Sequence, residues 1–121
     1  MYQIIFYRNT HGQSEVKQHI LNLKNSSTNK FAQSEFKKIT NYLTLLSEYG
    51  LSLGAPYIKH IDNNLWELRP SRNRILFATY TNNKFIILSI FLKKTEKTPR
   101  REIEKAKRNF IDFKRRFDDN E

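Results

Sequence analysis

Three arginines, Arg69, Arg72 and Arg74, fall within residues 65–77, LWELRPSRNRILF, where large apolar side chains flank them on both sides. A guanidinium group donates paired hydrogen bonds to a phosphate or a carboxylate, so this spacing could build a site for an anion. The same residues could also be solvated on the outer face of a sheet, which is the commoner situation for a single surface arginine. The place of these side chains in the fold decides between the two interpretations.

The register of the last predicted hairpin follows from its turn. Residues 81–84, TNNK, favour a two-residue loop at Asn82 and Asn83, because Asn tolerates the positive φ of a type I′ turn. This register places Phe77 opposite Leu88, and side chains alternate between the two faces of a sheet. One face is then apolar and is predicted to pack on helices through Trp66, Leu68, Ile75, Phe77, Ile86, Leu88, Ile90 and Leu92.

The opposite face is predicted to remain open and to carry the charges. A turn at residues 70–73 places Arg69 opposite Arg74, and like charges in that position repel unless an anion or Glu67 compensates them. Lys93 follows one step beyond the same row, so we expect Arg69, Arg74 and Lys93 to converge at one end of this open face. The rest of the face consists of Leu76, Ala78, Tyr80, Ile87, Ser89 and Phe91.

The elements that must position these cations are read from periodicity and from turn residues. The first two predicted helices cover about 13–23 and 32–50, are joined by polar residues 24–29, and the second ends at Gly50. A third begins at Thr98 as cap with Pro99 at its first position. The predicted strands cover about 2–8, 57–61, 65–69, 73–81 and 84–93. The order β-α-α-β-β-β-β-α predicts one α+β domain over residues 1–121, with a mostly antiparallel sheet packed on helices.

Composition narrows the class of partner. The formal net charge is +10, which favours nucleic acid first, an acidic protein second and an anionic membrane surface third. The absence of cysteine excludes disulfides, a thiolate zinc site and a cysteine nucleophile. The longest apolar stretch, residues 85–92, is far shorter than the roughly 20 residues of a membrane span, and no secretory signal is recognisable, so we expect a cytoplasmic protein with no membrane partner.

Two segments resemble a known family. LWELRPSRNRILFATY, followed by a hairpin and by FLKKTEKTPRREIEKAKRNF, is similar to the RelE/HigB superfamily of type II toxin–antitoxin toxins, and most similar to its phage-derived HigB-like branch. The shared features are Trp-Glu-Leu-Arg, a second arginine opening the next strand, and Lys-Lys-Thr-x-Lys-Thr-Pro before a basic helix. With PYIKH at residues 56–60, the similarity covers about 55–113.

This resemblance implies a RelE-like microbial ribonuclease fold and a function. The implied function is a toxin that cuts mRNA on the ribosome and so inhibits translation and growth. In such enzymes a ribose 2′-OH attacks the adjacent phosphate, and no metal or other cofactor is needed. The implied partners are mRNA, the ribosome and a cognate antitoxin, expected to be a small helix-turn-helix protein encoded by the adjacent gene.

The resemblance also assigns roles to individual residues. Cations stabilise the charge that builds up on the phosphoryl oxygens, and the matching catalytic positions are Arg69, Arg74, Lys93 and Lys94. The RNA-binding candidates are Lys59, His60, Lys97, Arg100 and Arg101. The candidates for proton transfer are Glu67 and His60, although Glu67 could instead pair with the arginines and His60 could be an ordinary polar surface residue.

Two other functions stay open at this point. The terminal-helix segment has neither the His nor the Tyr that some relatives place there, so a non-cleaving RNA- or ribosome-binding module is the main alternative. A DNA-binding regulator is a weaker one, because no helix-turn-helix signature is present and the cations cluster on the sheet.

Overall fold

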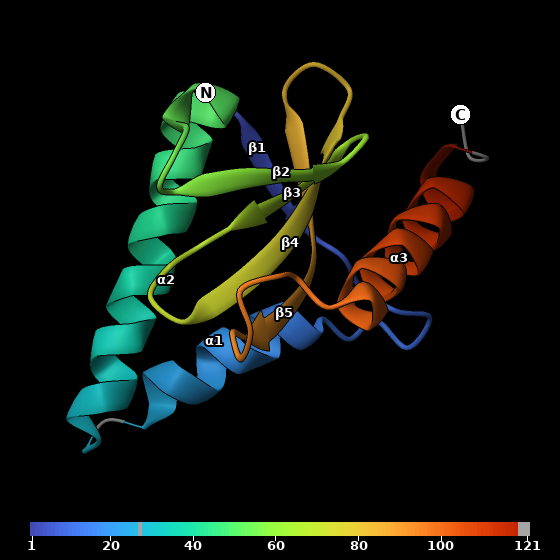
Figure 1. Cartoon of the computed structure of the whole chain (residues 1–121). Coiled ribbons are helices and arrows are strands. Elements are labelled where there is room, and N and C mark those ends of the chain that lie inside the picture. Colours follow the sequence, from blue (N-terminus) through green and yellow to red (C-terminus); the bar gives the residue numbers. More distant parts are fainter. Residues whose placement is uncertain (27, 119–121) are drawn as a thin grey trace.

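A computed structural model of the chain describes residues 1–26 and 28–118, so residue 27 of the predicted 24–29 turn lies outside the described residues (Figure 1). The elements, in chain order, are β1 (Gln3–Phe6), α1 (Glu15–Asn25), α2 (Lys30–Tyr49), a 3-10 turn (Gly50–Leu53), β2 (Ile58–Asp62), β3 (Leu65–Leu68), β4 (Asn73–Tyr80), β5 (Lys84–Leu92) and α3 (Arg100–Asp118). The sheet order is β1-β5-β4-β3-β2, with β1 parallel to β5 and the other neighbours antiparallel. This arrangement confirms the α+β class and the mostly antiparallel sheet.

The first two helices begin and end where local chemistry favours it. The side chain of Ser14 accepts a hydrogen bond from the Lys17 amide at the start of α1, and that of Asn29 accepts one from the Ala32 amide at the start of α2. Gly50 ends α2 with φ of 59°, and a Cβ at this position would lie 2.5 Å from the ring of Tyr2. Glycine is therefore required both by the backbone and by the packing of the N-terminal strand.

Helices cover both faces of the sheet, which corrects the prediction of an open face. Figure 1 shows α2 along one side of the sheet and α3 on the other. On the first side, residues of α1 and α2 such as Val16 and Ile39 pack with Ile75 of β4. On the second side, Ala106 and Phe113 of α3 pack with residues of β4 and β5. The predicted open face is therefore free only near the ends of the strands.

The register of the β4–β5 hairpin differs from the prediction at its turn and agrees with it farther away. Tyr80 pairs with Lys84, so the turn has three residues, and Phe77 pairs with Ile87 instead of Leu88. A bulge at Leu88 then restores the predicted register. The bulge exchanges the faces of three predicted residues: Ile86 and Leu88 lie on the α3 side, and Ile87 lies on the α1 and α2 side.

Beyond the bulge the predicted pairing holds at the end of the hairpin where the cations lie. Arg74 pairs with Phe91, and Ile75 pairs with Ile90, as alternation predicted. The end of the sheet that carries Arg74 is therefore placed correctly from sequence. None of the helices in the described part of the chain is long and apolar enough to cross a membrane.

Candidate nucleic-acid interface

Glu67 lies at the centre of the cationic end of the sheet. Its side chain is buried, and its Oε1 lies 3.5 Å from Nε of Arg69 and 3.9 Å from Nε of Arg74. One carboxylate therefore lies close to two guanidinium groups. The alternation of side chains along neighbouring strands brings these two groups together. The pair of arginines keeps a net positive charge, because a single negative charge cannot offset both.

Arg74 is held in place by its own turn. Its Nη1 donates hydrogen bonds of 2.9 Å to the carbonyl oxygens of Ser71 and Asn73. The side chain of Asn73 in turn donates a hydrogen bond of 2.8 Å to Oε1 of Glu35, a buried residue of α2. Burial, together with the neighbouring Arg69 charge, lowers the pKa of Arg74 below that of a free arginine. The guanidinium is therefore fixed in a partly dehydrated position.

A shallow pocket of about 450 Å³ lies beside Arg74. It is lined by Ser71, Arg72, Arg74, Lys93, Lys94, Thr95 and Glu96. A backbone hydrogen bond joins the two segments that line the pocket, because the Lys93 amide donates to the Arg72 carbonyl oxygen at 2.8 Å. Lys93 Nζ lies 3.6 Å from Glu96, whose side chain is 94% exposed and therefore easily displaced by another anion. Four cations around one exposed carboxylate form a site suited to a phosphate group.

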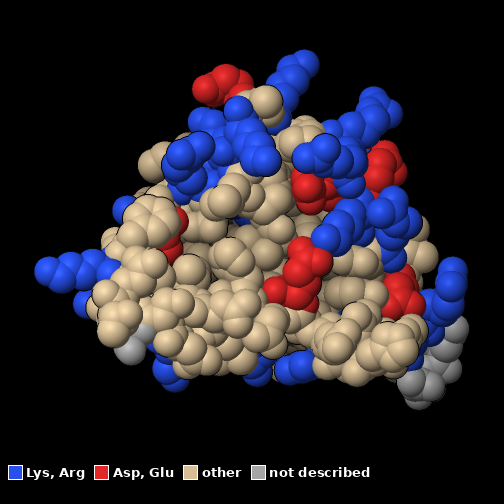
Figure 2. Space-filling model, turned by 90° about the horizontal axis from the view of Figure 1, so that it is seen from below, with Lys and Arg blue, Asp and Glu red and all other residues tan. Residues whose placement is uncertain are grey.

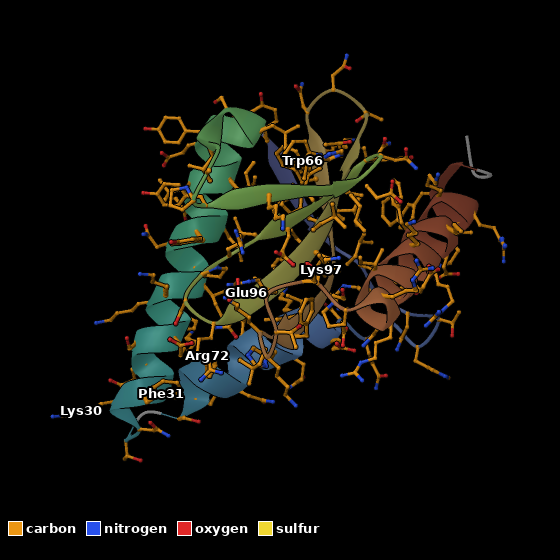
Figure 3. All side chains as sticks on the ribbon, in the orientation of Figure 1. Lys30, Phe31, Trp66, Arg72, Glu96 and Lys97 are labelled. Carbon is orange, nitrogen blue, oxygen red and sulfur yellow. The ribbon has the colours of Figure 1, made fainter. Side chains whose placement is uncertain are left out.

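Lysine and arginine side chains are unevenly spread over the molecular surface. In the view from below, lysine and arginine side chains crowd the upper edge, next to a broad area with few charges (Figure 2). The side-chain view shows Arg72 on the turn between β3 and β4, with Glu96 and Lys97 on the loop between β5 and α3 (Figure 3).

The loop before α3 contacts Glu67 directly, which corrects the prediction for the start of this helix. The hydroxyl of Thr98 donates a hydrogen bond of 2.6 Å to Oε2 of Glu67. The Pro99 carbonyl accepts the first helical bonds, from the amides of Glu102 and Ile103, so Pro99 occupies the capping position and α3 begins at Arg100.

A larger open groove of about 1020 Å³ runs between this loop, the start of α3 and the end of the β2 strand. The predicted RNA-binding residues Lys97, Arg100 and Arg101 line it, together with Lys94. At its far wall, Nζ of Lys107 lies 2.6 Å from Asp62, which connects α3 to the β2–β3 turn. Hydrogen bonding to Lys107 lowers the pKa of Asp62, and the same bond raises the pKa of Lys107.

Lys59 and His60 lie on opposite faces of the edge strand β2. Lys59 pairs across the ladder with Glu67 and is exposed on the face that carries the arginines. His60 pairs with Trp66, its ring lies 4.6 Å from the Trp66 ring, and its Nε2 is 2.8 Å from the Asn63 carbonyl oxygen. The structure therefore brings Lys59 to the arginine face and does not bring His60 there.

Some residues that build the site were not among the predicted ones. Arg72 was visible in the arginine run but fell in the predicted turn, where alternation assigns no face. Glu35, Asn73 and Thr98 act through contacts between segments distant in sequence, which no local pattern reveals. Among the described residues, no group of three or more His, Asp or Glu side chains could hold a metal ion.

A comparison with protein families finds a match over most of the chain. Residues 27–111 fit the family described as phage derived protein Gp49-like (DUF891). This range includes α2, the strands β2 to β5 and the first part of α3, so it contains every residue that lines the shallow pocket and the groove. A comparison with curated proteins finds no match.

Proposed function

Because the chain belongs to the family of phage-derived Gp49-like proteins, a toxin-like relative of RelE and HigB, we propose that it is the toxin of a type II toxin–antitoxin pair. The proposed activity is cleavage of mRNA on the ribosome, which arrests translation and growth. The observation that carries the proposal is the pocket of Arg72, Arg74, Lys93 and Lys94 beside Arg69. The proposed partners are mRNA, the ribosome and an antitoxin encoded next to the toxin gene.

The proposed reaction needs charge stabilisation more than any other contribution. The ribose 2′-OH attacks the adjacent phosphorus and loses its proton to water. The bond to the 5′ oxygen breaks and this oxygen takes up a proton from water, so the products are a 2′,3′-cyclic phosphate and a 5′-hydroxyl. Negative charge builds up on the non-bridging oxygens, and cations already fixed in place stabilise it without reorganising. Arg74 meets this requirement, because two carbonyl oxygens of its own turn hold its guanidinium.

Glu67 is better suited to positioning than to proton transfer. Its carboxylate is buried, accepts the Thr98 hydroxyl and faces both Arg69 and Arg74. We therefore assign it the role of aligning the two arginines. Lys93 and Lys94 supply the mobile cations on the other side of the proposed phosphate.

One observation favours a second candidate, a non-cleaving RNA- or ribosome-binding module. Of the described residues that line the pocket, Glu96 is the one carboxylate, Lys93 pairs with it, and no histidine lines the pocket. The described lining therefore offers no histidine and no buried carboxylate to take the proton of the 2′-OH. The pocket could therefore hold a phosphate without cleaving its ester.

Primer extension on mRNA from cells induced to express the chain separates the two candidates. Discrete cuts and growth arrest, both lost in Arg74→Ala and kept in the matched surface variant Arg115→Ala, support the nuclease. Intact mRNA with co-sedimentation on ribosomes supports the binding module. If the mRNA stays intact and the chain does not associate with ribosomes, both candidates are refuted. Co-expression of the adjacent gene is expected to relieve the arrest.

A further inference from the structure

The large groove and the phosphate pocket adjoin each other. Lys94 and Thr95 line both of them, one after the other on the loop between β5 and α3. A ligand whose phosphate lies against Arg74 and Lys93 can therefore reach the groove across Lys94 and Thr95. The groove is the larger of the two, with a volume of about 1020 Å³.

The walls of the groove combine apolar surfaces with cations. Its apolar lining consists of Ile61, Phe91, Leu92, Pro99 and Ile103. Leu92 is 56% exposed, an unusual exposure for a large apolar side chain at the end of a central strand. A ligand that fits this groove must therefore offer a flat or apolar surface as well as negative charge.

The charges of the groove leave cations in excess. The lining has five cations, Lys94, Lys97, Arg100, Arg101 and Lys107, against three carboxylates. Asp62 pairs with Lys107 and Glu102 with Arg101, and Glu104 is the third carboxylate. The cations Lys94, Lys97 and Arg100 make no ion pair with any residue in the described part of the chain.

We propose that this groove binds the base of the nucleotide next to the phosphate held at Arg74, so that the chain binds one phosphate and one neighbouring base of single-stranded RNA. This inference rests on the proposed function and adds a second subsite to it. A base offers the flat apolar face that Phe91 and Leu92 can contact, and the backbone supplies the charge for Lys97 and Arg100. A paired base in a duplex cannot enter, because its faces are covered by its neighbours.

The test compares three probes on the full chain labelled with ¹⁵N. The probes are inorganic phosphate, ribose 5-phosphate, and a diadenosine dinucleotide whose first ribose carries a 2′-methoxy group and cannot be cleaved. Phosphate and ribose phosphate are expected to move amide signals of residues 71–74 and 93–96 only. The dinucleotide is expected to move these and the groove signals at 61–62, 91–92 and 97–103, and to bind roughly tenfold more tightly. Groove signals that do not respond to the dinucleotide overturn the inference.

Two matched variants test the apolar wall. Leu92→Ala is expected to weaken dinucleotide binding several-fold and to leave phosphate binding unchanged. Ile111→Ala removes a side chain of similar exposure, 53%, from α3 outside the groove, and is expected to change neither. Equal effects of the two variants contradict a base subsite. So does a short polyglutamate peptide that moves the groove signals as strongly as the dinucleotide, because the groove would then be a site for acidic protein.

The result of the NMR test of the groove does not depend on the result of the test for mRNA cleavage. Groove signals that respond to the dinucleotide while cellular mRNA stays intact support the subsite and refute the nuclease. Cleaved mRNA with unresponsive groove signals refutes the subsite and leaves the nuclease standing.

Discussion

The hydroxyl of Thr98 donates a hydrogen bond of 2.6 Å to Oε2 of Glu67, which joins the loop before α3 to the strand β3. The other oxygen of the same carboxylate faces the arginine pair, at 3.5 Å from Arg69 and 3.9 Å from Arg74. One buried side chain therefore fixes the two walls of the proposed RNA site relative to each other. The loop with Lys93 and Lys94 cannot leave the arginines without breaking this contact.

Replacing Thr98 by valine tests the strength of this contact. Valine keeps the shape of the side chain and removes the donor, so the Thr98→Val variant is expected to lose about 2 kcal/mol of unfolding free energy, as for a hydrogen bond to a charged group. Urea unfolding measures the loss. Thr95→Val is the control, because Thr95 donates to the Lys97 carbonyl oxygen on an exposed loop, and a cost below about 1 kcal/mol is expected there. Equal losses of unfolding free energy in the two variants would show that the bond from Thr98 to Glu67 stabilises the fold no more than the exposed bond of Thr95.

The charge of Glu67 is expected to matter more than its hydrogen bond. The Glu67→Gln variant leaves Arg69 and Arg74 facing each other without a carboxylate, so we expect a loss of roughly 3 kcal/mol, as for breaking a buried ion pair. Glu102→Gln breaks the pair with Arg101, whose side chain is 80% exposed, and is expected to cost about 1 kcal/mol or less. Both values come from denaturant unfolding at one pH, and a Glu67→Gln variant as stable as Glu102→Gln contradicts the central role of this carboxylate.

The alternation of side chains along the strands predicted correctly that the arginines meet. It did not predict that α3 covers the face of the sheet on which they lie. Arg69 and Arg74 meet because side chains alternate, which depends only on neighbouring residues in each strand. The bulge at Leu88 depends on the length of the turn, and three residues there could not be told from two by residue type. Ala106 and Phe113, which α3 buries, are seven residues apart and so lie on one face of the helix, but this spacing does not show which side of the sheet receives it. The Glu35–Asn73 bond joins residues 38 positions apart, and no periodicity reports such a contact.

The far end of α3 is expected to be sensitive to pH in both directions. Tyr7 of the N-terminal segment donates a hydrogen bond of 2.7 Å to Asp112, which also pairs with Arg116 at 2.7 Å. The bond from Tyr7, with the Arg116 charge, lowers the pKa of Asp112, and burial together with Asp112 raises the pKa of Tyr7. The contribution of Asp112 to the free energy of unfolding is present above the usual carboxyl pKa of about 4. It is lost as the pH falls through the lower pKa of Asp112 in the folded chain. The Tyr7 contribution is present below the usual tyrosine pKa of about 10 and is lost as the pH rises through its higher folded value.

Tyr7→Phe checks this dependence, because it removes the shared hydrogen bond. The difference in unfolding free energy between the wild-type chain and this variant is expected to be largest near neutral pH and to shrink at both extremes. The control is Phe31→Leu, which changes a side chain that is 72% exposed and carries no ionisable group, and its difference from wild type is expected to stay constant with pH. A difference for Tyr7→Phe that does not vary with pH would show that the Tyr7–Asp112 bond does not form in solution.

Salt dependence reports how many cations contact phosphate. Binding of a single-stranded RNA is expected to weaken with salt, and each lost phosphate contact lowers the slope of log affinity against log salt concentration by about 0.7. Lys94→Ala is expected to lower the slope by this amount, because Lys94 lines both the pocket and the groove. Arg115→Ala removes an exposed charge at the other end of α3 and is expected to leave the slope unchanged. Equal slopes for Lys94→Ala and wild type would place the RNA elsewhere.

The geometry of Arg74 predicts that lysine cannot replace it. The guanidinium donates to two carbonyl oxygens of its own turn through Nη1, and its remaining donors can still face a phosphate. A lysine ammonium at the same place has one centre of charge and cannot hold the turn and the phosphate together. If the chain cleaves mRNA, Arg74→Lys is therefore expected to reduce the cleavage rate by about 10²–10³-fold, as for the loss of one fixed donor to the transition state.

The matched change is Lys93→Arg. Lys93 is paired only with the exposed Glu96 and lies on a loop, so a longer cation there can still reach the same phosphate. We expect this variant to cleave within several-fold of the wild-type rate in primer-extension assays on purified translating ribosomes. Unfolding curves measured in parallel separate the loss of a donor from the loss of the fold. Near-normal cleavage by a folded Arg74→Lys variant would mean that charge alone is needed at this position, and that the fixed orientation of the guanidinium has no part in the reaction.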